Sequence, residues 1–522
     1  MDRRQVLRMG AAASGGLLLG RPTGALAQSL GPTDEYGTAR ASRLFAGTWV
    51  AHADMHNHTL LSDGDGDAAM AFASMRDAGL DIACLTDHST LSKDLAESPC
   101  LDNTDCQSLA GLDENAWALT EQLADGANTP GAFTAIRGFE WSSPTLGHMN
   151  VWFSQGWTDP LHTGGLGTVA DLLKFAHGEG LPDDGLGFPT LEAIIDLAAI
   201  PGEGMALWYQ WLKLDPGSPV TGGGSDGIAG FNHPGRENGR FSDFSFDAGL
   251  VDRLVSLELF NRREDYLFER VDDGRDSPLV ACLDAGWRPG ILGVTDEHGT
   301  DWGYPDGKGR GGLWVTELTR AGVRDAMERR RFFATNLKGL RLDAAANGVR
   351  MGQPLTHTSG TVTFQVDIDR GAMLWGQDVL VQVLQTGSPL PTIVHTEQAR
   401  LPTPDEPVIR FDAPIDIQNG DWVVLRVTDP TLEPDGRADA VYAAAGGAIA
   451  YASPFWLTTD GPPPPGPIGA DPAPEPEPVP VPAGDVLPST GGGVGLAALA
   501  TAGLLALRRR GTDHDHEGHG HG

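Results

Sequence analysis

The sequence predicts an α/β barrel followed by a small all-β sandwich, and three observations support this fold class. The chain has 522 residues, 40% of them hydrophobic, so two or three domains and a large core are expected. Short apolar runs alternate with amphipathic stretches over residues 48–333, as strands alternate with helices in an α/β barrel. After about residue 338 the pattern changes to period-two runs separated by glycine and proline, which is typical of a sandwich.

The barrel domain is expected to span residues 46–338. Residues 81–85 and 133–136 are short apolar runs of the kind found in buried parallel strands. Residues 156–229 are rich in glycine, and we interpret them as an insertion over one barrel face. Within the insertion, Trp208, Tyr209 and Trp211 either line an aromatic pocket or pack one face of a helix. Helices are predicted over residues 67–77, 114–123, 191–199 and 205–214.

The all-β domain is expected over residues 339–458. It has few histidines and no cluster of ligand-type side chains, so its expected role is packing or surface presentation. Its alternating or apolar strand-like runs lie at residues 362–368, 379–384, 422–427 and 454–457.

The N-terminus predicts export. Residues 1–28 combine Arg3-Arg4, a modest apolar stretch and the small residues Ala25-Leu-Ala27, as in a secretory signal peptide. The paired arginines followed by Val6-Leu7 resemble a twin-arginine signal, whose route carries proteins that are already folded. An ordinary N-terminal anchor is the alternative, although the apolar stretch is short for a membrane span.

The C-terminus predicts attachment to the cell surface. Residues 459–486 are proline-rich and form an extended linker. Residues 487–510 contain Leu487-Pro-Ser-Thr-Gly491, an apolar span and three arginines, an order that resembles the sortase (LPXTG) signal of Gram-positive cell walls. Residues 511–522 form a histidine-rich tail that such signals normally lack and that a sortase cut would remove. Without the cut, the apolar span would be a short membrane anchor.

Composition limits the kinds of partner that the chain is expected to bind. The formal net charge is −33, so binding of nucleic acid through a general basic surface is excluded. The acidity either attracts cations to clustered carboxylates or only keeps the chain soluble. No C-x-x-C pair is present, and Cys84 and Cys282 lie in apolar or helical settings that predict burial. Cys100 and Cys106 flank a polar loop and form either a disulfide or two thiols.

Five short motifs carry ligand-type side chains. In Asp54-Met-His56-Asn-His58, the two histidines are two residues apart, so a strand places both on the same side. Asp63 follows where the chain turns away, close enough to serve a neighbouring ion. Thr86-Asp87-His88 follows an apolar strand directly, which is where barrel enzymes place their chemistry.

The other three motifs repeat this arrangement. Glu140 is expected to close an apolar strand, and a carboxylate there can bridge two cations; Gly147-His148 follows it. His233 lies in Asn-His-Pro-Gly-Arg236, and Asp296 and His298 follow the apolar run that ends at Val294. A lone buried histidine is usually a core residue, but five such motifs in one domain indicate a multi-metal site.

The order of these motifs resembles the polymerase-and-histidinol-phosphatase (PHP) metallohydrolases over residues 50–300. The strings F-T-A-I-R-G-F-E-W, G-F-N-H-P-G-R and L-E-L-F-N are similar to the branch that contains carbaryl-type hydrolases. The resemblance implies a distorted (β/α)7 barrel and two or three metal ions. It also implies three ligand sets: His56, His58, Glu140 and Asp296; Glu140, His148 and His233; and Asp63, His88 and His298.

These residues predict an exported hydrolase that uses a metal-activated hydroxide on a small-molecule substrate. The mixed imidazole and carboxylate donors suit zinc, manganese or iron. We expect Asp54 and Asp87 to orient ligands or relay a proton, and Arg236 either to clamp a phosphate or to be an ordinary surface residue. The superfamily favours phosphoesters, whereas the branch leaves carbamates and aryl esters as the alternative. A non-catalytic metal-binding surface protein is the alternative of another class.

Overall fold

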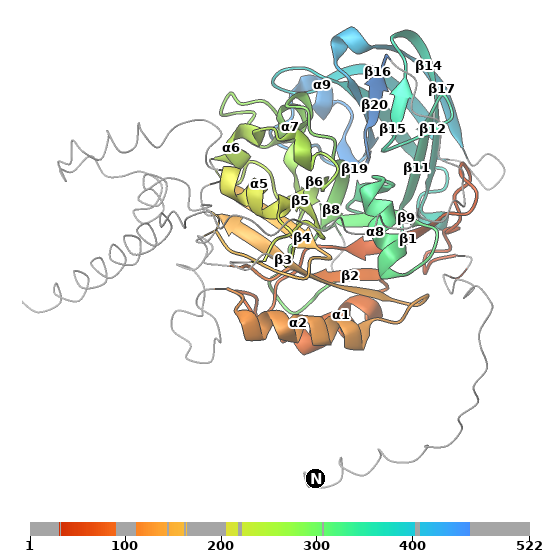
Figure 1. The fold of residues 1–522 in the computed structure, drawn as a ribbon. Coiled ribbons are helices and arrows are strands. Elements are labelled where there is room, and N and C mark those ends of the chain that lie inside the picture. The colour runs from red at the N-terminus through yellow and green to blue at the C-terminus, as the bar shows by residue number, and fades with distance from the viewer. Residues whose placement is uncertain are drawn as a thin grey trace, which may run out of the picture.

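The computed structural model describes residues 31, 33–89, 111–143, 146–160, 163, 205–217, 222–237, 239–304, 307–401 and 408–459. These residues form a mixed α/β fold with one sheet of sixteen strands and a second sheet of four (Figure 1). No helix in these ranges is both long enough and apolar enough to cross a membrane. The predicted signal peptide, linker, sorting signal and tail all lie outside the described residues.

The first half of the large sheet wraps around a common interior. Strands β1, β2 and β3 are parallel neighbours, β4 runs antiparallel to both β3 and β5, and β5, β6 and β8 are again parallel. The ends of β1 and β8 meet, because Asn57 bridges Glu297 and the His58 N–H donates to the Glu297 carbonyl at 2.9 Å. The bounds are β1 Trp49–Asp54, β2 Ile82–Leu85, β3 Thr134–Ser143, β4 Gly147–Trp152, β5 Ile228–Phe231, β6 Leu254–Asn261, β7 Glu264–Asp265, β8 Gly290–Val294 and β9 Arg310–Val315.

The interior of these strands is apolar. Side chains two apart along β1, β2, β8 and β9 point inward, and α8 closes one end with Val323 and Met327. Metal-type side chains lie at the opposite, carboxyl ends of the parallel strands. The ligand-type side chains therefore lie at one end of the strands and the apolar side chains at the other.

The described helices are few, so the regular alternation of a (β/α)7 barrel is not confirmed. Helices α1 and α2 lie side by side next to β2 and β3 (Figure 1) and begin at the carboxylate caps Asp67 and Asp113. The segment labelled α6 has positive φ at every residue and is a left-handed turn. The bounds are α1 Ala68–Asp77, α2 Glu114–Ala127, α5 Ala206–Lys213, α6 Arg240–Phe244, α7 Pro278–Asp284, α8 Arg320–Glu328 and α9 Ala440–Ala443.

Most local expectations within the described ranges agree with the structure. Helices occupy the expected stretches around 67–77, 114–123 and 205–214, whereas 191–199 and most of the 156–229 insertion lie outside the described residues. Trp208 stacks between Trp141 and Trp211, with ring centroids 4.6 and 5.4 Å apart, so the aromatic residues pack a helix face. Cys84 and Cys282 are buried thiols, and the Cys100–Cys106 question lies outside the described residues.

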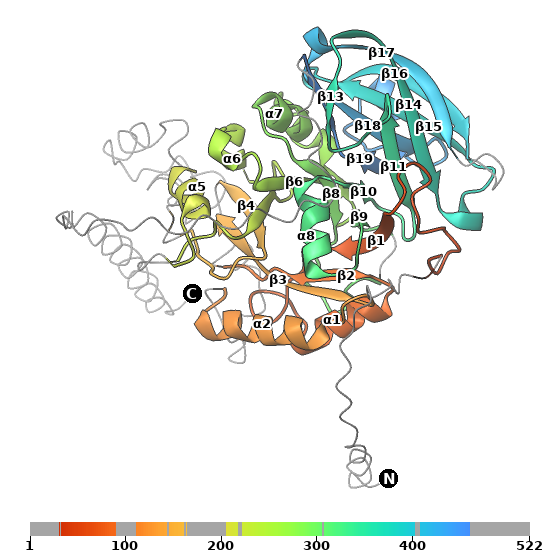
Figure 2. The ribbon, with the colours of Figure 1, turned by 45° about the vertical axis from the view of Figure 1, so that its right-hand side comes forward.

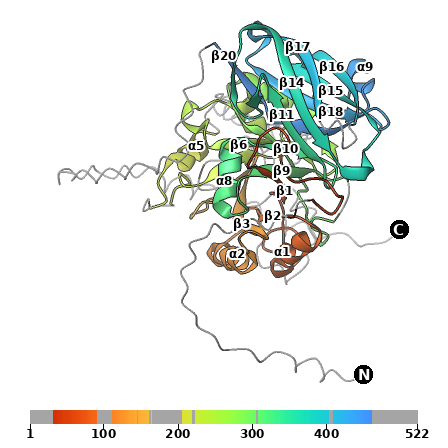
Figure 3. The same ribbon diagram turned by 90° about the vertical axis from the view of Figure 1, so that its right-hand side faces the viewer.

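The C-terminal half is all-β apart from short helical turns, and part of it continues the large sheet. Strand β10 pairs with β9 on one side and with β19 on the other, so hydrogen bonds run across the expected domain boundary. Figure 2 labels all three strands, and Figure 3 shows β9 and β10 from another side. A four-stranded sheet, β12-β11-β14-β17, packs over this extension around Phe364 and Val366. The bounds are β10 Phe332–Thr335, β11 Arg341–Ala346, β12 Val349–Arg350, β13 Pro354–Thr356, β14 Ser359–Asp369, β15 Asp378–Gln385, β16 Thr392–Arg400, β17 Ile409–Asp416, β18 Trp422–Asp429, β19 Gly447–Ala452 and β20 Phe455–Thr458.

A buried polar network joins the two halves. Arg426 donates to the Tyr451 hydroxyl at 3.0 Å, and that hydroxyl donates to Asp265 at 2.7 Å. Burial raises the pKa of Asp265 to about 6, although Arg426 and Tyr451 favour its charged form. Asp265 follows β6 by four residues, so this network fixes the turn that carries Arg262 to the site described below.

Tyr451→Phe is expected to destabilise the fold by about 1–3 kcal/mol, because it leaves a buried carboxylate oxygen without its donor. Urea unfolding measures this loss. Tyr304→Phe is the matched control, since Tyr304 is 50% exposed and its change should stay within about 0.5 kcal/mol. Equal stability of the two variants would contradict the prediction.

Candidate metal centre

Six strands bring the predicted ligand residues to one place. His56 and His58 follow β1, His88 follows β2, His233 follows β5, and Asp296 with His298 follows β8. Asp296 and His233 both have positive φ, at 48° and 21°, as the chain leaves its strand. One expectation was wrong: Glu140 does not close its strand, because β3 continues to Ser143 and pairs with the hairpin partner β4, which carries His148.

Glu140 is at the centre of the cluster. One of its oxygens, Oε1, lies 3.1 Å from His56 Nε2, 3.3 Å from His148 Nδ1 and 3.4 Å from His233 Nε2. Its other oxygen lies 2.6 Å from His88 Nδ1. Burial by itself would raise the pKa of Glu140, but the neighbouring imidazoles hold it well below its usual range, so the group is a carboxylate.

The first group of donor atoms belongs to His56, His58 and Asp296. The Nε2 atoms of His56 and His58 are 3.0 Å apart, and both lie within 3.4 Å of Asp296 Oδ1. All three side chains are at most 2% exposed. Burial and the charges of His298 and His88 lower the pKa of His58 far below its usual range, so its imidazole is neutral, as a metal ligand requires.

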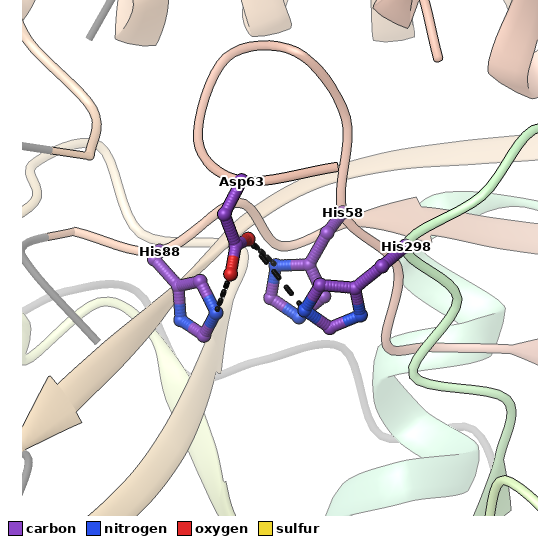
Figure 4. A group of neighbouring side chains, drawn as sticks. All are labelled: His58, Asp63, His88 and His298. Carbon is purple, nitrogen blue, oxygen red and sulfur yellow. Dashed lines mark ion pairs between the residues drawn. The ribbon is translucent and has the colours of Figure 1, made fainter. Parts of the chain in front are cut away.

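A second group surrounds Asp63 (Figure 4). Its carboxylate lies 3.4 Å from His88 Nε2, 3.5 Å from His298 Nε2 and 3.9 Å from His58 Nδ1. Three imidazoles from three strand ends thus face one carboxylate on a loop. His298 is 25% exposed, so this group lies on the solvent side of the cluster.

A third group contains a residue that sequence reasoning missed. His148, His233 and Glu237 offer ligand atoms within 4.8 Å of one another, and all three are buried. Glu237 lies four residues after His233, a spacing that could have drawn attention to it. Glu258 was also missed: it contacts His56 Nδ1 at 2.9 Å, and it lies in the string L-E-L-F-N.

The donor set fits divalent metal ions. Atoms bound to one zinc ion at tetrahedral geometry lie roughly 3.3–3.6 Å apart, which matches many of the spacings above. Several ligand-type atoms have no hydrogen-bond partner among the described residues, including His58 Nδ1, His88 Nε2 and both ring nitrogens of His148. Imidazole and carboxylate without thiolate suit zinc, manganese or iron. Bound cations would also balance the partly buried Asp63 and the buried carboxylates Glu140, Glu237, Glu258 and Asp296.

Asp54 and Asp87 hold loops rather than ligand side chains. Asp54 accepts hydrogen bonds from the N–H, at 3.1 Å, and the hydroxyl of Thr295, the residue before Asp296. Asp87 accepts from the Thr59 N–H at 2.7 Å and from Ser62 at 2.8 Å, which fixes the loop that carries Asp63. Burial raises the pKa of each aspartate to about 6. The proton-relay role expected for them stays a prediction.

Two arginines lie at the mouth of the cluster. Arg262 Nε is 3.1 Å from Asp296 Oδ2, and Arg236 Nη1 is 3.8 Å from the same oxygen. Their side chains are 40% and 26% exposed, so both guanidinium groups lie between the buried carboxylate and solvent. Arg236 was among the predicted residues, whereas Arg262 was not.

A family model described as "Protein of unknown function (DUF3604)" matches residues 42–161, and no curated protein matches the sequence of this chain. A two-domain protein from Bacteroides vulgatus, described as containing a predicted PHP-like metal-dependent phosphoesterase, is 14% identical, with coverage of 80% of this chain and 100% of that chain and a TM-score of 0.35.

Two further solved structures each cover 48% of this chain and 88% of their own at 16% identity. One is a candidate metal-dependent phosphoesterase from Bifidobacterium adolescentis, with a TM-score of 0.25. The other is an amidohydrolase from Chromobacterium violaceum with bound sulfate and no metal, with a TM-score of 0.21. The structures found are thus one with a predicted PHP-like phosphoesterase, one candidate metal-dependent phosphoesterase and one amidohydrolase.

Proposed function

We propose that this chain is a metal-dependent hydrolase of the PHP type that cleaves small-molecule phosphoesters. The observation that carries the proposal is Glu140, whose two oxygens lie within 3.4 Å of four imidazoles from four strand ends. A purely structural metal site needs four ligands around one ion. Here nine predicted ligand residues and Glu237 converge on a cluster that opens toward solvent at His298.

Divalent ions bound here would lower the pKa of water and neutralise charge that develops on the substrate. Other residues of the chain orient the ligand side chains. Glu258 accepts from the His56 imidazole and the His233 N–H, at 2.9 and 2.8 Å, and so orients both ligand residues. Asn232 holds Glu140 Oε1 at 2.6 Å. The pre-formed cluster therefore needs little rearrangement to act.

Arg262 and Arg236 favour an anionic substrate. Both guanidinium groups already face a carboxylate oxygen of Asp296, at 3.1 and 3.8 Å, and the anionic oxygens of a phosphate are acceptors that guanidinium groups bind as well. Because the two arginines are partly exposed beside the most exposed ligand, His298, a phosphoester could bind them and the metals together. This arrangement supports a phosphoester over a neutral carbamate or aryl ester.

The cellular setting is also a proposal. The twin-arginine-like signal over residues 1–28 and the sorting signal over residues 487–510 support export and attachment to the cell wall or membrane. A protein that folds before export would carry its metals with it. Labelling of intact cells, with and without an Arg3→Lys, Arg4→Lys leader, tests this proposal; equal surface display of both would reject the twin-arginine route.

The activity is tested with the purified, metal-loaded chain and three substrate types: aryl phosphates, aryl phosphodiesters and aryl carbamates. Turnover of a phosphate or phosphodiester supports the proposal. Turnover of carbamates alone would replace the phosphoester assignment, and no turnover of any substrate would favour a metal-binding surface protein.

Arg262→Ala is expected to raise KM for an aryl phosphate roughly 10- to 100-fold, because one charge-assisted hydrogen bond of about 1.5–3 kcal/mol is lost. Steady-state kinetics measure the change. Arg262→Lys should recover part of the loss, and a neutral ester should be affected much less. A uniform loss on charged and neutral substrates would instead indicate a structural role.

A further inference from the structure

A small cavity lies on the face of β1 that points away from the apolar interior. Ala51 and Ala53 belong to that interior, so His52 between them points to the opposite side, where it lines the cavity. The cavity has a volume of about 100 Å³, room for roughly three water molecules or one small oxyanion. The described residues that line it include none of the predicted metal ligands, so the cavity is distinct from the metal centre.

The wall opposite β1 is formed by residues 34–40, which are fastened at two points. Arg40 pairs with Asp81, the residue before β2, at 2.6 Å. The Thr38 hydroxyl donates to the carbonyl of Gly339, which also lines the cavity, at 3.1 Å. The cavity is therefore bounded by segments that are hydrogen-bonded to one another, and its shape does not depend on a free loop.

Two buried side chains at the cavity have polar atoms without a hydrogen-bond partner among the described residues. The side chain of His52 is 7% exposed, and both of its ring nitrogens lack such a partner. The side chain of Asp34 is 3% exposed; its Oδ1 accepts from the Tyr36 and Thr38 N–H groups, but its Oδ2 has no donor. The two side chains are 3.6 Å apart, too far for a good hydrogen bond. Buried polar atoms are costly unless they are paired, so an occupant that bonds to both is favoured.

The charges around the cavity favour an anion. Three cationic side chains line it: Arg40, Arg310 and Lys338. Arg40 already pairs with Asp81, but Arg310 and Lys338 still outnumber the one buried carboxylate. The second carboxylate at the cavity, Glu35, is exposed, so solvent screens its charge. A small anion is therefore a better occupant than a second cation.

Asp34 restricts which anion fits. Burial alone would raise the pKa of Asp34, but His52 and two backbone N–H groups lower it, so the group is a carboxylate. A carboxylate only accepts hydrogen bonds, and it repels an oxyanion that carries no proton. Hydrogen phosphate keeps at least one proton at neutral pH, so its hydroxyl can donate to Asp34 while its other oxygens accept. Sulfate has no proton at this pH and lacks that donor.

We propose that this cavity binds one hydrogen phosphate ion, whose hydroxyl donates to Asp34 Oδ2 and whose charged oxygens face His52, Arg310 and Lys338. The small volume favours the free ion over a phosphoester with a large organic group. The site does not rest on the proposed function, because it shares no ligand residue with the metal centre. Its failure would leave the hydrolase proposal unchanged, and absence of turnover would leave this site unchanged.

The test is equilibrium dialysis of the full-length chain against labelled inorganic phosphate, with and without excess sulfate. In Asp34→Asn, which keeps Oδ1 and replaces Oδ2 by an amide donor, the preference for phosphate over sulfate at one site should fall at least about 10-fold. Phosphate bound at the metal centre is common to both proteins and cancels. An unchanged preference in Asp34→Asn overturns the proposal.

A second variant tests the charge. Lys338→Met should weaken phosphate binding at the same site at least about 10-fold, because it removes a charge that faces the anion. Lys213→Met is the matched control: Lys213 is partly exposed, pairs with Asp247 and lies outside the cavity, so phosphate binding should stay the same. Equal binding by Lys338→Met and Lys213→Met overturns the proposal.

A third measurement needs no variant, in case Asp34→Asn does not fold. Arsenate has the shape and protonation of phosphate, and its arsenic atom scatters anomalously. Diffraction at the arsenic edge from the unmodified protein should place a peak within hydrogen-bond reach of His52 and Asp34. Arsenic at the metal centre only, or water alone in the cavity, overturns the proposal.

Discussion

Glu140→Gln is expected to lower kcat/KM at least about 10³-fold, or about 4 kcal/mol of transition-state stabilisation, and to weaken metal binding. The substitution keeps the size of the side chain but removes the charge that faces four imidazoles. It also places an amide N–H₂ where nitrogen atoms or metal ions need an acceptor. Kinetics on the substrate panel and the zinc content of the same sample measure both effects.

A matched control separates this effect from a general one. Glu121→Gln makes the same change at an exposed position, where the carboxylate is 58% exposed and pairs with Arg137. It should leave turnover and zinc content unchanged, because an exposed ion pair contributes little. Wild-type turnover in Glu140→Gln would contradict the central role of this carboxylate, whereas equal losses in both variants would indicate a folding defect.

The sequence predicts the gathering of ligands well because that gathering follows from local rules. His56 and His58 share a side of the chain, and His88, His233 and Asp296 each follow an apolar run. Carboxyl ends of parallel strands meet at one edge, so residues placed there converge without knowledge of the full topology. The helix starts at Asp67 and Asp113 follow from capping in the same way.

What the sequence leaves out depends on tertiary pairing. Glu258 becomes important only because His56, a buried histidine from a distant segment, contacts it, and no local pattern marks that contact. Glu140 was expected at a strand end, but β3 continues because β4 folds back on it as a hairpin. The junction of β10 with β19 was missed for a similar reason: period-two runs indicate strands but not which strand they pair with.

Removal of the metal ions is expected to destabilise the chain strongly. A ligand at 1,000 times its dissociation constant contributes about 4 kcal/mol, and each bound ion adds such a contribution. Without metal, the imidazoles take up protons to balance the buried carboxylates. Burial lowers the pKa of His233, but Glu237 and Glu140 raise it, to about 9, and Asp63 and Glu140 raise that of His88 well above its usual range. Thermal unfolding with and without a chelator measures the loss.

The pH dependence of this loss has a definite sign. A histidine whose folded pKa is raised stabilises the metal-free chain fully below its unfolded pKa of about 6.5, and this contribution is lost as the pH rises toward 9. Metal binding must displace the same protons, so apparent metal affinity rises over that range. The difference in melting temperature between loaded and metal-free protein should therefore widen from pH 6.5 to pH 9. A difference that narrows would mean that the histidines of this centre do not exchange protons for metal.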